Sequence, residues 1–277
     1  MKKANVPVLK DLVLLGGGHS HIAVLKRFGM RPIPGVRLTL ICRDTHAPYS
    51  GMLPGLIAGH YGFDDAHIDL GPLTRFAGAQ FFHDEAIGLD TANKRVLCRD
   101  RPPVAYDLLS INIGSIPNTN QVPGAAEHAV AVKPIDRFVA HWHEVAQRVL
   151  GHEGTVRIGV VGAGAGGVEL LLSVQHRLGR MLAQAGRTGA DPEYHLITET
   201  EEILPTHNRR VRRKFTRILA ERGINVHTGH RVSRVDAGRL HCQDGTDIAL
   251  DEILWVTMAG AAPWLAETGL ALAHPGF

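Results

Sequence analysis

The sequence has few cysteines and none in a closely spaced pair. Its three cysteines, Cys42, Cys98 and Cys242, are far apart and never occur as Cys-x-x-Cys. That spacing excludes a redox-active dithiol and a zinc site of paired cysteines, so we expect no metal ligands. Disulfide bonds are rare in reducing compartments, and this cysteine usage is typical of a cytoplasmic protein with free thiols.

Long apolar runs are also absent. No stretch approaches the roughly 18 consecutive apolar residues that indicate a membrane-spanning helix. Lys2 and Lys3 are followed by only a short apolar strand, which does not match a secretory signal peptide. Both absences favour a cytoplasmic location.

The sequence also has no large excess of positive or negative charge. The net charge is +3 over 277 residues, and 44% of the residues are hydrophobic, as in ordinary globular proteins. So small a charge gives no support for a nucleic-acid partner. One basic run on an expected helix is either a solvated face or a surface for an anionic membrane or a cofactor phosphate. The run contains Arg209, Arg210, Arg212, Arg213, Lys214 and Arg217.

The most informative stretch is the glycine-rich segment Val156–Glu169. Its apolar run Ile158–Val161 predicts a buried parallel strand, and an apolar helix follows. Between them Gly162, Gly164 and Gly167 have the Gly-x-Gly-x-x-Gly spacing. Glycine at these positions permits, in order, a tight turn, close approach of a pyrophosphate, and close packing of helix on strand. Free N–H groups and the helix dipole then favour phosphate, so this unit predicts a dinucleotide site.

A weaker copy of this unit lies near the N-terminus. The apolar run Leu12–Leu15 is followed by Gly16-Gly17-Gly18-His19-Ser20-His21 and then by helical spacing from Ile22 to Phe28. The third glycine position holds His21, whose side chain must push the helix away from the strand or point into a gap. Two such units in one chain predict two dinucleotide sites.

Polar residues follow the second strand of each unit, where an acidic side chain binds the ribose of a dinucleotide. After Val36–Cys42, Asp44 can fill this role and Arg43 can meet a phosphate or adenine, or the two form a surface pair. Glu199 ends the corresponding strand of the second unit, 37 positions after Gly162 instead of the usual 20 or so. Because its carboxylate would repel a 2′-phosphate, we expect NADH to be preferred to NADPH.

The region between the two units predicts further strands and one unusual loop. Tyr49–Gly59 mixes glycine with apolar residues, which predicts a loop that leads into one short helix. Such a loop either lies against a flat cofactor ring or is a packed connection. Ala86–Leu89 and Val96–Cys98 predict a hairpin, and the strand Tyr106–Ile111 ends near Gly114.

These two units, the second set inside the first, resemble the two-dinucleotide-binding flavoproteins of the pyridine nucleotide-disulfide oxidoreductase superfamily. Four stretches are similar to one branch, the type II NADH dehydrogenase-like proteins often fused to selenide, water dikinase. The stretches are Gly16–His21, Tyr49–Tyr61, Ile113–Ser115 and Trp255–Pro263. The resemblance covers essentially the whole chain and implies an α/β fold of two Rossmann-like domains, with FAD on the first and NAD(P)H on the second. It implies hydride transfer from nicotinamide to flavin, with a quinone or another acceptor taking the electrons.

Site residues follow from the resemblance position by position. Glu169, directly after the second motif, matches a glutamate near the nicotinamide–flavin contact in type II dehydrogenases and is the catalytic candidate. Alternatively it is a carboxylate that favours the helix dipole. The FAD candidates are Gly16, Gly18, His19, Ser20, Arg43, Asp44, Ser50, Gly51, Met52 and Gly114, and the NAD(H) candidates are Gly162, Gly164, Gly167 and Glu199.

The chain also departs from the family pattern. Without the dithiol and without a kinase segment, neither disulfide reduction nor selenophosphate synthesis is expected. The third FAD motif and the part that forms the acceptor site and membrane face would lie beyond Phe277, so we expect a truncated enzyme that holds FAD weakly. Peripheral contact with the inner face of the membrane is one expected role of that part. The expected domains are residues 1–118 for FAD, 119–250 for NAD(P), and 251–277 as the return to the first. The alternative function is a non-catalytic dinucleotide-binding module associated with selenium metabolism.

Overall fold

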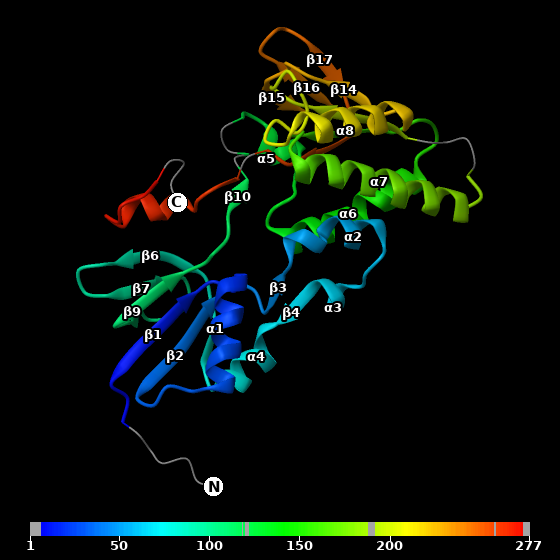
Figure 1. Cartoon of the computed structure of the whole chain (residues 1–277). Helices are drawn as coiled ribbons and strands as arrows, with labels where there is room; N and C mark the ends of the chain where they lie inside the picture. The colour runs from blue at the N-terminus through cyan, green and yellow to red at the C-terminus, as the bar shows by residue number, and fades with distance from the viewer. Residues whose placement is uncertain (1–6, 118, 120–121, 188–191, 258, 274–277) are drawn as a thin grey trace. The chain divides into compact units, whose positions relative to one another are not determined.

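The computed structural model describes residues 7–117, 119, 122–187, 192–257 and 259–273 (Figure 1). The chain divides into two compact units. Unit 1 contains the described residues of Met1–Tyr49, Asp64–Ser115 and Gly260–Phe277, and unit 2 contains those of Ser50–Phe63 and Ile116–Ala259. Each unit is built on a parallel sheet, and the main segment of unit 2 is inserted between two segments of unit 1. The predicted α/β fold with one domain inserted in the other is therefore confirmed.

Unit 1 contains a four-stranded parallel sheet in the order β5-β2-β1-β9. Val13 and Leu14 of β1 point to opposite faces of the sheet, and both are buried. Because both faces are covered, the strands are nearly continuous apolar runs instead of alternating ones. The strands are β1 (Lys10–Leu15), β2 (Val36–Cys42), β5 (Gln80–His83) and β9 (Leu108–Ile111).

Helices cover one face of this sheet and short antiparallel strands cover the other. Leu25 and Phe28 of α1 pack with Leu70 of α4 against the first face. On the second face, Val96 belongs to the predicted hairpin, which the antiparallel pairing of β6 with β7 confirms. The bounds are α1 (His19–Met30), β3 (His46–Pro48), α3 (Phe63–Ala66), β4 (His67–Asp69), α4 (Leu70–Ala77), β6 (Ala86–Asp90), β7 (Arg95–Cys98), β8 (Val104–Ala105) and η3 (Pro263–Glu267).

Unit 2 contains a five-stranded parallel sheet in the order β11-β18-β12-β13-β14. Along β13, Leu196 faces the helices of one layer and Ile197 faces the other side. This sheet too is covered on both faces. The strands are β11 (Val130–Ala131), β12 (Arg157–Val161), β13 (Glu193–Ile197), β14 (Asn225–His227) and β18 (Glu252–Trp255).

Helices α2, α6, α7 and α8 share the core on the first face of this sheet, and α5 with a three-stranded antiparallel sheet packs on the second. No helix in the described part of the chain is long and apolar enough to cross a membrane. The bounds are η1 (Ser50–Met52), α2 (Leu53–Ala58), β10 (Ile116–Pro117), α5 (Ala125–His128), α6 (Ile135–Gly151), α7 (Ala165–Gln184), α8 (Arg209–Glu221), β15 (Val232–Asp236), β16 (Arg239–Cys242), β17 (Asp247–Ala249) and β19 (Ala259–Gly260).

Residues 50–63 cluster with unit 2, although the sequence-based boundaries place them in the first domain. The reason is helix α2, whose Leu53 and Ile57 are buried in the same core as Phe138 of α6 and Leu178 of α7. A six-residue helix is not stable alone and depends on the core that it completes. Which cofactor each predicted domain holds stays a prediction.

Two histidines, the buried His195 and the half-buried His227, face each other across neighbouring strands of unit 2. His195 Nδ1 of β13 and His227 Nε2 of β14 are 3.0 Å apart, and the planes of the two rings differ by 17°. This bond needs an N–H on one nitrogen and a lone pair on the other, so at least one ring must be neutral. Burial lowers the pKa of both histidines, and the neighbouring His195 and His230 lower the pKa of His227 further.

We expect the free energy of unfolding to fall as the pH is lowered from about 7.5 to about 5.5. An unfolded histidine with a pKa of about 6.5 takes up a proton over this range, whereas the folded pair resists it, so protons favour the unfolded state. Urea unfolding at both pH values should show a smaller fall for His227→Gln than for the unmodified chain. The exposed His207→Gln is the control and should keep the full fall. Equal pH dependence in all three proteins would contradict a role for the pair.

Candidate functional site

Both glycine-rich turns lie at the carboxyl end of a strand where the strand order reverses. In unit 1 the chain passes from β1 to the adjacent β2, while β9 lies on the other side of β1. In unit 2 it passes from β12 to β13, with β18 on the other side. Open α/β sheets bind ligands in the crevice at such a point. Each unit therefore has one strand-order reversal at which a ligand is expected.

Two glycines of the turn after β12 are required by the fold itself. Gly162 has a φ of +114°, and its N–H donates to the Ile197 carbonyl oxygen at 2.8 Å. A Cβ on Gly162 would come within 2.6 Å of the Val256 carbonyl oxygen. A Cβ on Gly167 would overlap the carbonyl oxygen of Gly162, because α7 crosses directly over the turn. These contacts explain glycine at the first and third positions without any ligand.

The middle glycine is different, because the protein leaves space beside it. Gly164 has a φ of −70°, which any residue adopts, and no described atom outside its chain neighbours lies within 4 Å of a Cβ built on it. As the N-cap of α7 it provides no side-chain cap, and the first turn of α7 contains no acidic residue. The free N–H groups and the positive end of the helix dipole lie at this space, which suits an anionic group such as a phosphate.

In the turn after β1, packing accounts for the glycines, and Asn112 makes most of the contacts. Gly16 has a φ of +92°, and a Cβ on it would overlap the Asn112 carbonyl oxygen. A Cβ on Gly18 would overlap the Asn112 side chain, and one on Gly17 would lie 2.8 Å from Leu70. Asn112 is a residue that the sequence-based reasoning missed. Its one signal is a polar side chain directly after the apolar strand β9.

His21 holds this turn to the neighbouring strand. Its side chain is buried, with Nδ1 2.6 Å from the Gly16 carbonyl oxygen and Nε2 2.9 Å from the Ser110 hydroxyl of β9. Burial lowers the pKa of His21, which favours the neutral ring. In that form Nδ1–H donates to Gly16, and Nε2 accepts from Ser110. The sequence predicts that this side chain either pushes the helix away from the strand or points into a gap. In the structure it instead links the turn to the sheet by hydrogen bonds.

The N-terminus of α1 also presents backbone donors. Gly18 is its N-cap without a side-chain cap, and its first turn has no acidic residue. The predicted FAD residues His19 and Ser20 are exposed in this turn, and the His19 ring lies 4.8 Å from the Tyr49 ring. The turn thus offers N–H groups and two exposed polar side chains to an anionic ligand.

Arg43 and Asp44 follow β2 and bind each other. Arg43 Nη2 and Nε lie 3.0 and 3.1 Å from Asp44 Oδ2, and both side chains are about one third exposed. This geometry matches the surface-pair alternative. A role in binding ribose or phosphate would require the pair to open and stays a prediction.

The remaining FAD candidates lie in different parts of the chain. Ser50, Gly51 and Met52 form the short helix η1 and cluster with unit 2. Gly114 has a φ of +76° and lines a cavity of about 490 Å³ in unit 1, together with Asn112. The cavity lies directly beyond the carboxyl end of β9. Strand β9 pairs with β1, and β1 leads into the Gly16 turn.

Both acidic candidates of unit 2 are exposed. Glu169 lies on α7 beyond the helix's first turn, so favourable interaction with the dipole does not explain it. Glu199 follows β13, and its Oε2 lies 3.5 Å from Arg231 Nε. With side chains 62% and 67% exposed, this pair is weak and can reorganise around a ligand. The catalytic role of Glu169 and the ribose-binding role of Glu199 stay predictions.

The glycines of α7 and its turn allow a matched set of alanine substitutions. Gly164→Ala should change the free energy of unfolding by less than about 0.5 kcal/mol but weaken NADH binding about tenfold, since it fills only the open space. Gly167→Ala should destabilise by about 1–3 kcal/mol through overpacking. Gly179→Ala, in the middle of α7 with no described atom near its Cβ position, should stabilise by about 0.5–1 kcal/mol without changing binding. Urea unfolding and calorimetric titration measure both quantities. Unchanged NADH affinity in Gly164→Ala would contradict this assignment.

The chain matches known proteins along almost its whole length. Residues 10–277 match the family described as pyridine nucleotide-disulphide oxidoreductase. NADH dehydrogenase-like protein YutJ of Bacillus subtilis is 26% identical over 260 residues, which cover 92% of this chain and 66% of that protein. External alternative NAD(P)H-ubiquinone oxidoreductase B4, mitochondrial, of Arabidopsis thaliana is 23% identical over 93% of this chain and 48% of that protein. The chain thus spans about half to two thirds of the length of these relatives.

A solved structure shows the same fold. NDH2 from Plasmodium falciparum in complex with NADH superposes with a TM-score of 0.80 at 17% identity, covering 94% of this chain and 57% of that chain. This likeness concerns the fold alone, whereas the family match rests on sequence. With glycine turns at both strand-order reversals and a family match from residue 10 onward, the chain belongs to the pyridine nucleotide-disulphide oxidoreductase family.

Proposed function

We propose that the chain is the dinucleotide-binding part of an FAD-dependent NAD(P)H oxidoreductase. Unit 1 would hold FAD at the turn after β1, and unit 2 would hold NAD(H) at the turn after β12. When bound, the two nucleotides would supply the redox chemistry, a hydride transfer from nicotinamide to flavin with a quinone or another acceptor taking the electrons.

The observation that carries the proposal is the open space at Gly164. The fold explains Gly162 and Gly167 by close contacts, but it gives no reason for glycine at position 164. A pyrophosphate at the uncapped start of α7 would give that reason, because it would use the space and the free N–H groups together. The residues present therefore fit a dinucleotide, and family membership supports the same conclusion.

The chain's own residues would bind and orient the nucleotides. His21 would keep the turn of unit 1 in place through its bonds to Gly16 and Ser110, so that the N–H groups of α1 stay directed at a phosphate. Glu199 would accept hydrogen bonds from ribose hydroxyls. Glu169, exposed on α7, is the candidate for the contact between nicotinamide and flavin.

The proposal also covers the electron acceptor, the branch of the family and the cellular location. One relative is named for ubiquinone, which supports a quinone acceptor. The exposed basic side chains of α8 support peripheral contact with an anionic membrane from the cytoplasm, although Arg212 and Arg217 already pair with Glu202 and Glu221. Similarity to the proteins fused to selenide, water dikinase stays a prediction.

An absorption spectrum tests the proposed function. Titrated with FAD, the purified chain should change the flavin absorption spectrum with weak but saturable binding, and NADH should bleach the bound flavin in the absence of oxygen. The same protein with NADH omitted is the control. A chain that binds NADH but shows no saturable FAD binding in this titration would contradict the oxidoreductase and support the non-catalytic module.

We expect NADH to bind more tightly than NADPH, with Glu199 as the cause. Its carboxylate would accept hydrogen bonds from a ribose 2′-OH and repel a 2′-phosphate. Glu199→Ala should reduce the preference about tenfold, which corresponds to about 1.4 kcal/mol. Arg231→Ala is the matched control, because it removes the partner of Glu199 and should increase the preference. Titration of both nucleotides by calorimetry gives the ratios. Tighter NADPH binding by the unmodified chain would overturn the assignment.

A further inference from the structure

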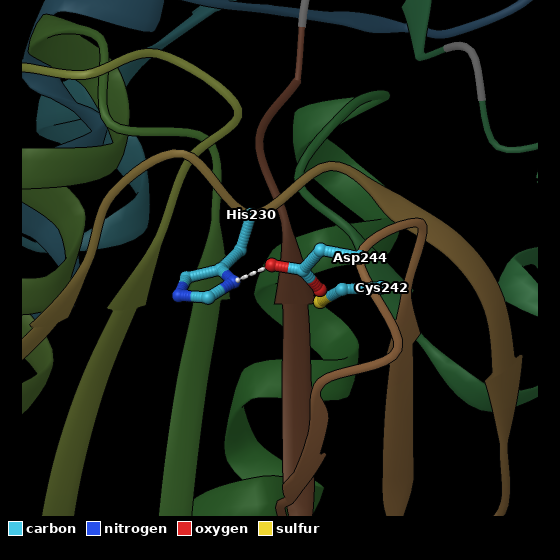
Figure 2. Close-up of side chains that lie close together, drawn as sticks. All are labelled: His230, Cys242 and Asp244. Atoms are coloured by element: carbon cyan, nitrogen blue, oxygen red, sulfur yellow. Dashed lines mark hydrogen bonds and ion pairs between the residues drawn. The ribbon is translucent and has the colours of Figure 1, made fainter.

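Three potential metal ligands of different chemistry meet at one end of unit 2, outside the glycine turns. His230 precedes β15, Cys242 ends β16, and Asp244 lies in the turn that leads to β17 (Figure 2). One donor atom from each lies within 4.8 Å of the other two. His230 Nδ1 is 2.7 Å from Asp244 Oδ2, and the Cys242 sulfur lies beside the same carboxylate.

The backbone fixes the three residues relative to one another. Cys242 pairs with Val232 in the β15–β16 ladder, which places the end of one strand beside the start of the other. The N–H of Gln243 donates to the Arg231 carbonyl oxygen at 2.9 Å, and so ties the turn to the residue after His230. Asp244 Oδ1 accepts from the Thr246 N–H at 2.9 Å, which orients the carboxylate. These bonds hold the cluster together without an ion.

We propose that His230, Cys242 and Asp244 form a binding site for a divalent transition-metal ion, with Zn²⁺ as the best match. Imidazole nitrogen, thiolate sulfur and carboxylate oxygen are the ligands that Zn²⁺ uses, and three protein ligands leave the fourth tetrahedral position to water. Oxygen-binding ions such as Mg²⁺ and Ca²⁺ are a poor match for a set that contains sulfur and nitrogen.

The geometry needs only small side-chain movements. Metal–ligand bonds of about 2.0–2.3 Å in a tetrahedron place the ligand atoms about 3.3–3.7 Å apart. His230 Nδ1 and Asp244 Oδ2 must therefore separate slightly from their hydrogen bond. Their side chains are 26% and 45% exposed, so both can move and solvent can reach the site, whereas Cys242 is buried.

Metal binding would change the proton positions in a defined way. The Cys242 thiol forms a sulfur–metal bond and releases its proton to water. The proton of a neutral His230 ring moves by exchange with water to Nε2, which points away from the other two side chains (Figure 2). The ion then replaces the hydrogen bond between His230 and Asp244. No oxidant or reductant takes part.

The arrangement does not suit a cysteine nucleophile. His230 Nδ1 faces Asp244, and the other ring nitrogen points away from Cys242, so no base is directed at the thiol (Figure 2). Burial and the carboxylates of Asp244 and Asp247 raise the pKa of the Cys242 thiol. Slow alkylation of Cys242 is therefore expected with or without metal, and a spectroscopic probe is needed.

Cobalt substitution tests the site on the full chain, without an affinity tag. Co²⁺ added to metal-free protein should produce a sulfur-to-cobalt charge-transfer band in the near ultraviolet with a stoichiometry of one, and Zn²⁺ should remove it. Cys242→Ser should abolish the band. His230→Gln and Asp244→Asn should each weaken Co²⁺ binding at least tenfold. The control Cys98→Ser, a buried thiol of unit 1, should leave the band unchanged.

Several results would overturn the proposal. These are the absence of a thiolate band, a band that survives Cys242→Ser, or full affinity in both His230→Gln and Asp244→Asn. The last two variants change partly exposed side chains, so they decide the question even if Cys242→Ser fails to fold, which circular dichroism would show. Because the readout involves neither FAD nor NADH, its failure is independent of the proposed oxidoreductase activity.

Discussion

The architecture of unit 2 depends on how closely a helix can approach the turn that precedes it. Gly167 lies against the carbonyl oxygen of Gly162 with no room for a side chain. The next residues of α7, Val168 and Leu171, are fully buried in the core beneath the helix. A side chain at position 167 would move the start of α7, and with it Val168 and Leu171, away from the sheet. The absence of a Cβ at Gly167 thus determines how α7, the longest described helix, packs on its sheet.

Unit 1 satisfies the same constraint by hydrogen bonding. At the corresponding position His21 is buried, and its two ring nitrogens pair with Gly16 and Ser110. Burying an imidazole is unfavourable unless both nitrogens have partners, and here both do. The ring therefore takes the place of a direct helix–turn contact and also links the turn to β9. The two units share a topology but differ in what holds the helix start in position.

Local patterns in the sequence were sufficient for the elements next to the glycine turns. Strand β2 has the bounds Val36–Cys42 expected from the sequence, and α7 is the apolar helix expected after the second glycine motif. Helix α4 was not predicted, because Gly71-Pro72 resembles a turn. It forms because Asp69 caps it by accepting from the Gly71 N–H, and proline is tolerated in a first turn.

Contacts between distant parts of the chain were not predictable in the same way. Asn112 limits the space at Gly16 and Gly18, far away in the sequence, and only the pairing of β1 with β9 brings them together. The meeting of His230 with Cys242 and Asp244 likewise depends on the register of β15 and β16. No spacing rule for metal ligands anticipates such a register. The candidate site was thus predictable where its residues are consecutive and unpredictable where strand pairing assembles it.

The open space beside Gly164 has a consequence for how such proteins can diverge. If unit 2 binds a nucleotide at Gly164 as proposed, ligand binding and folding would depend on different glycines, and one substitution at position 164 could remove the nucleotide without changing the fold. In unit 1, a side chain added at Gly16, Gly17 or Gly18 would clash with other protein atoms. Mutations there would therefore destabilise the fold and could not remove ligand binding alone. Under the proposed function, a duplicated gene would therefore lose binding of the second nucleotide more easily than binding of the first. Inactive members of such a lineage should more often retain an intact first turn than an intact second one.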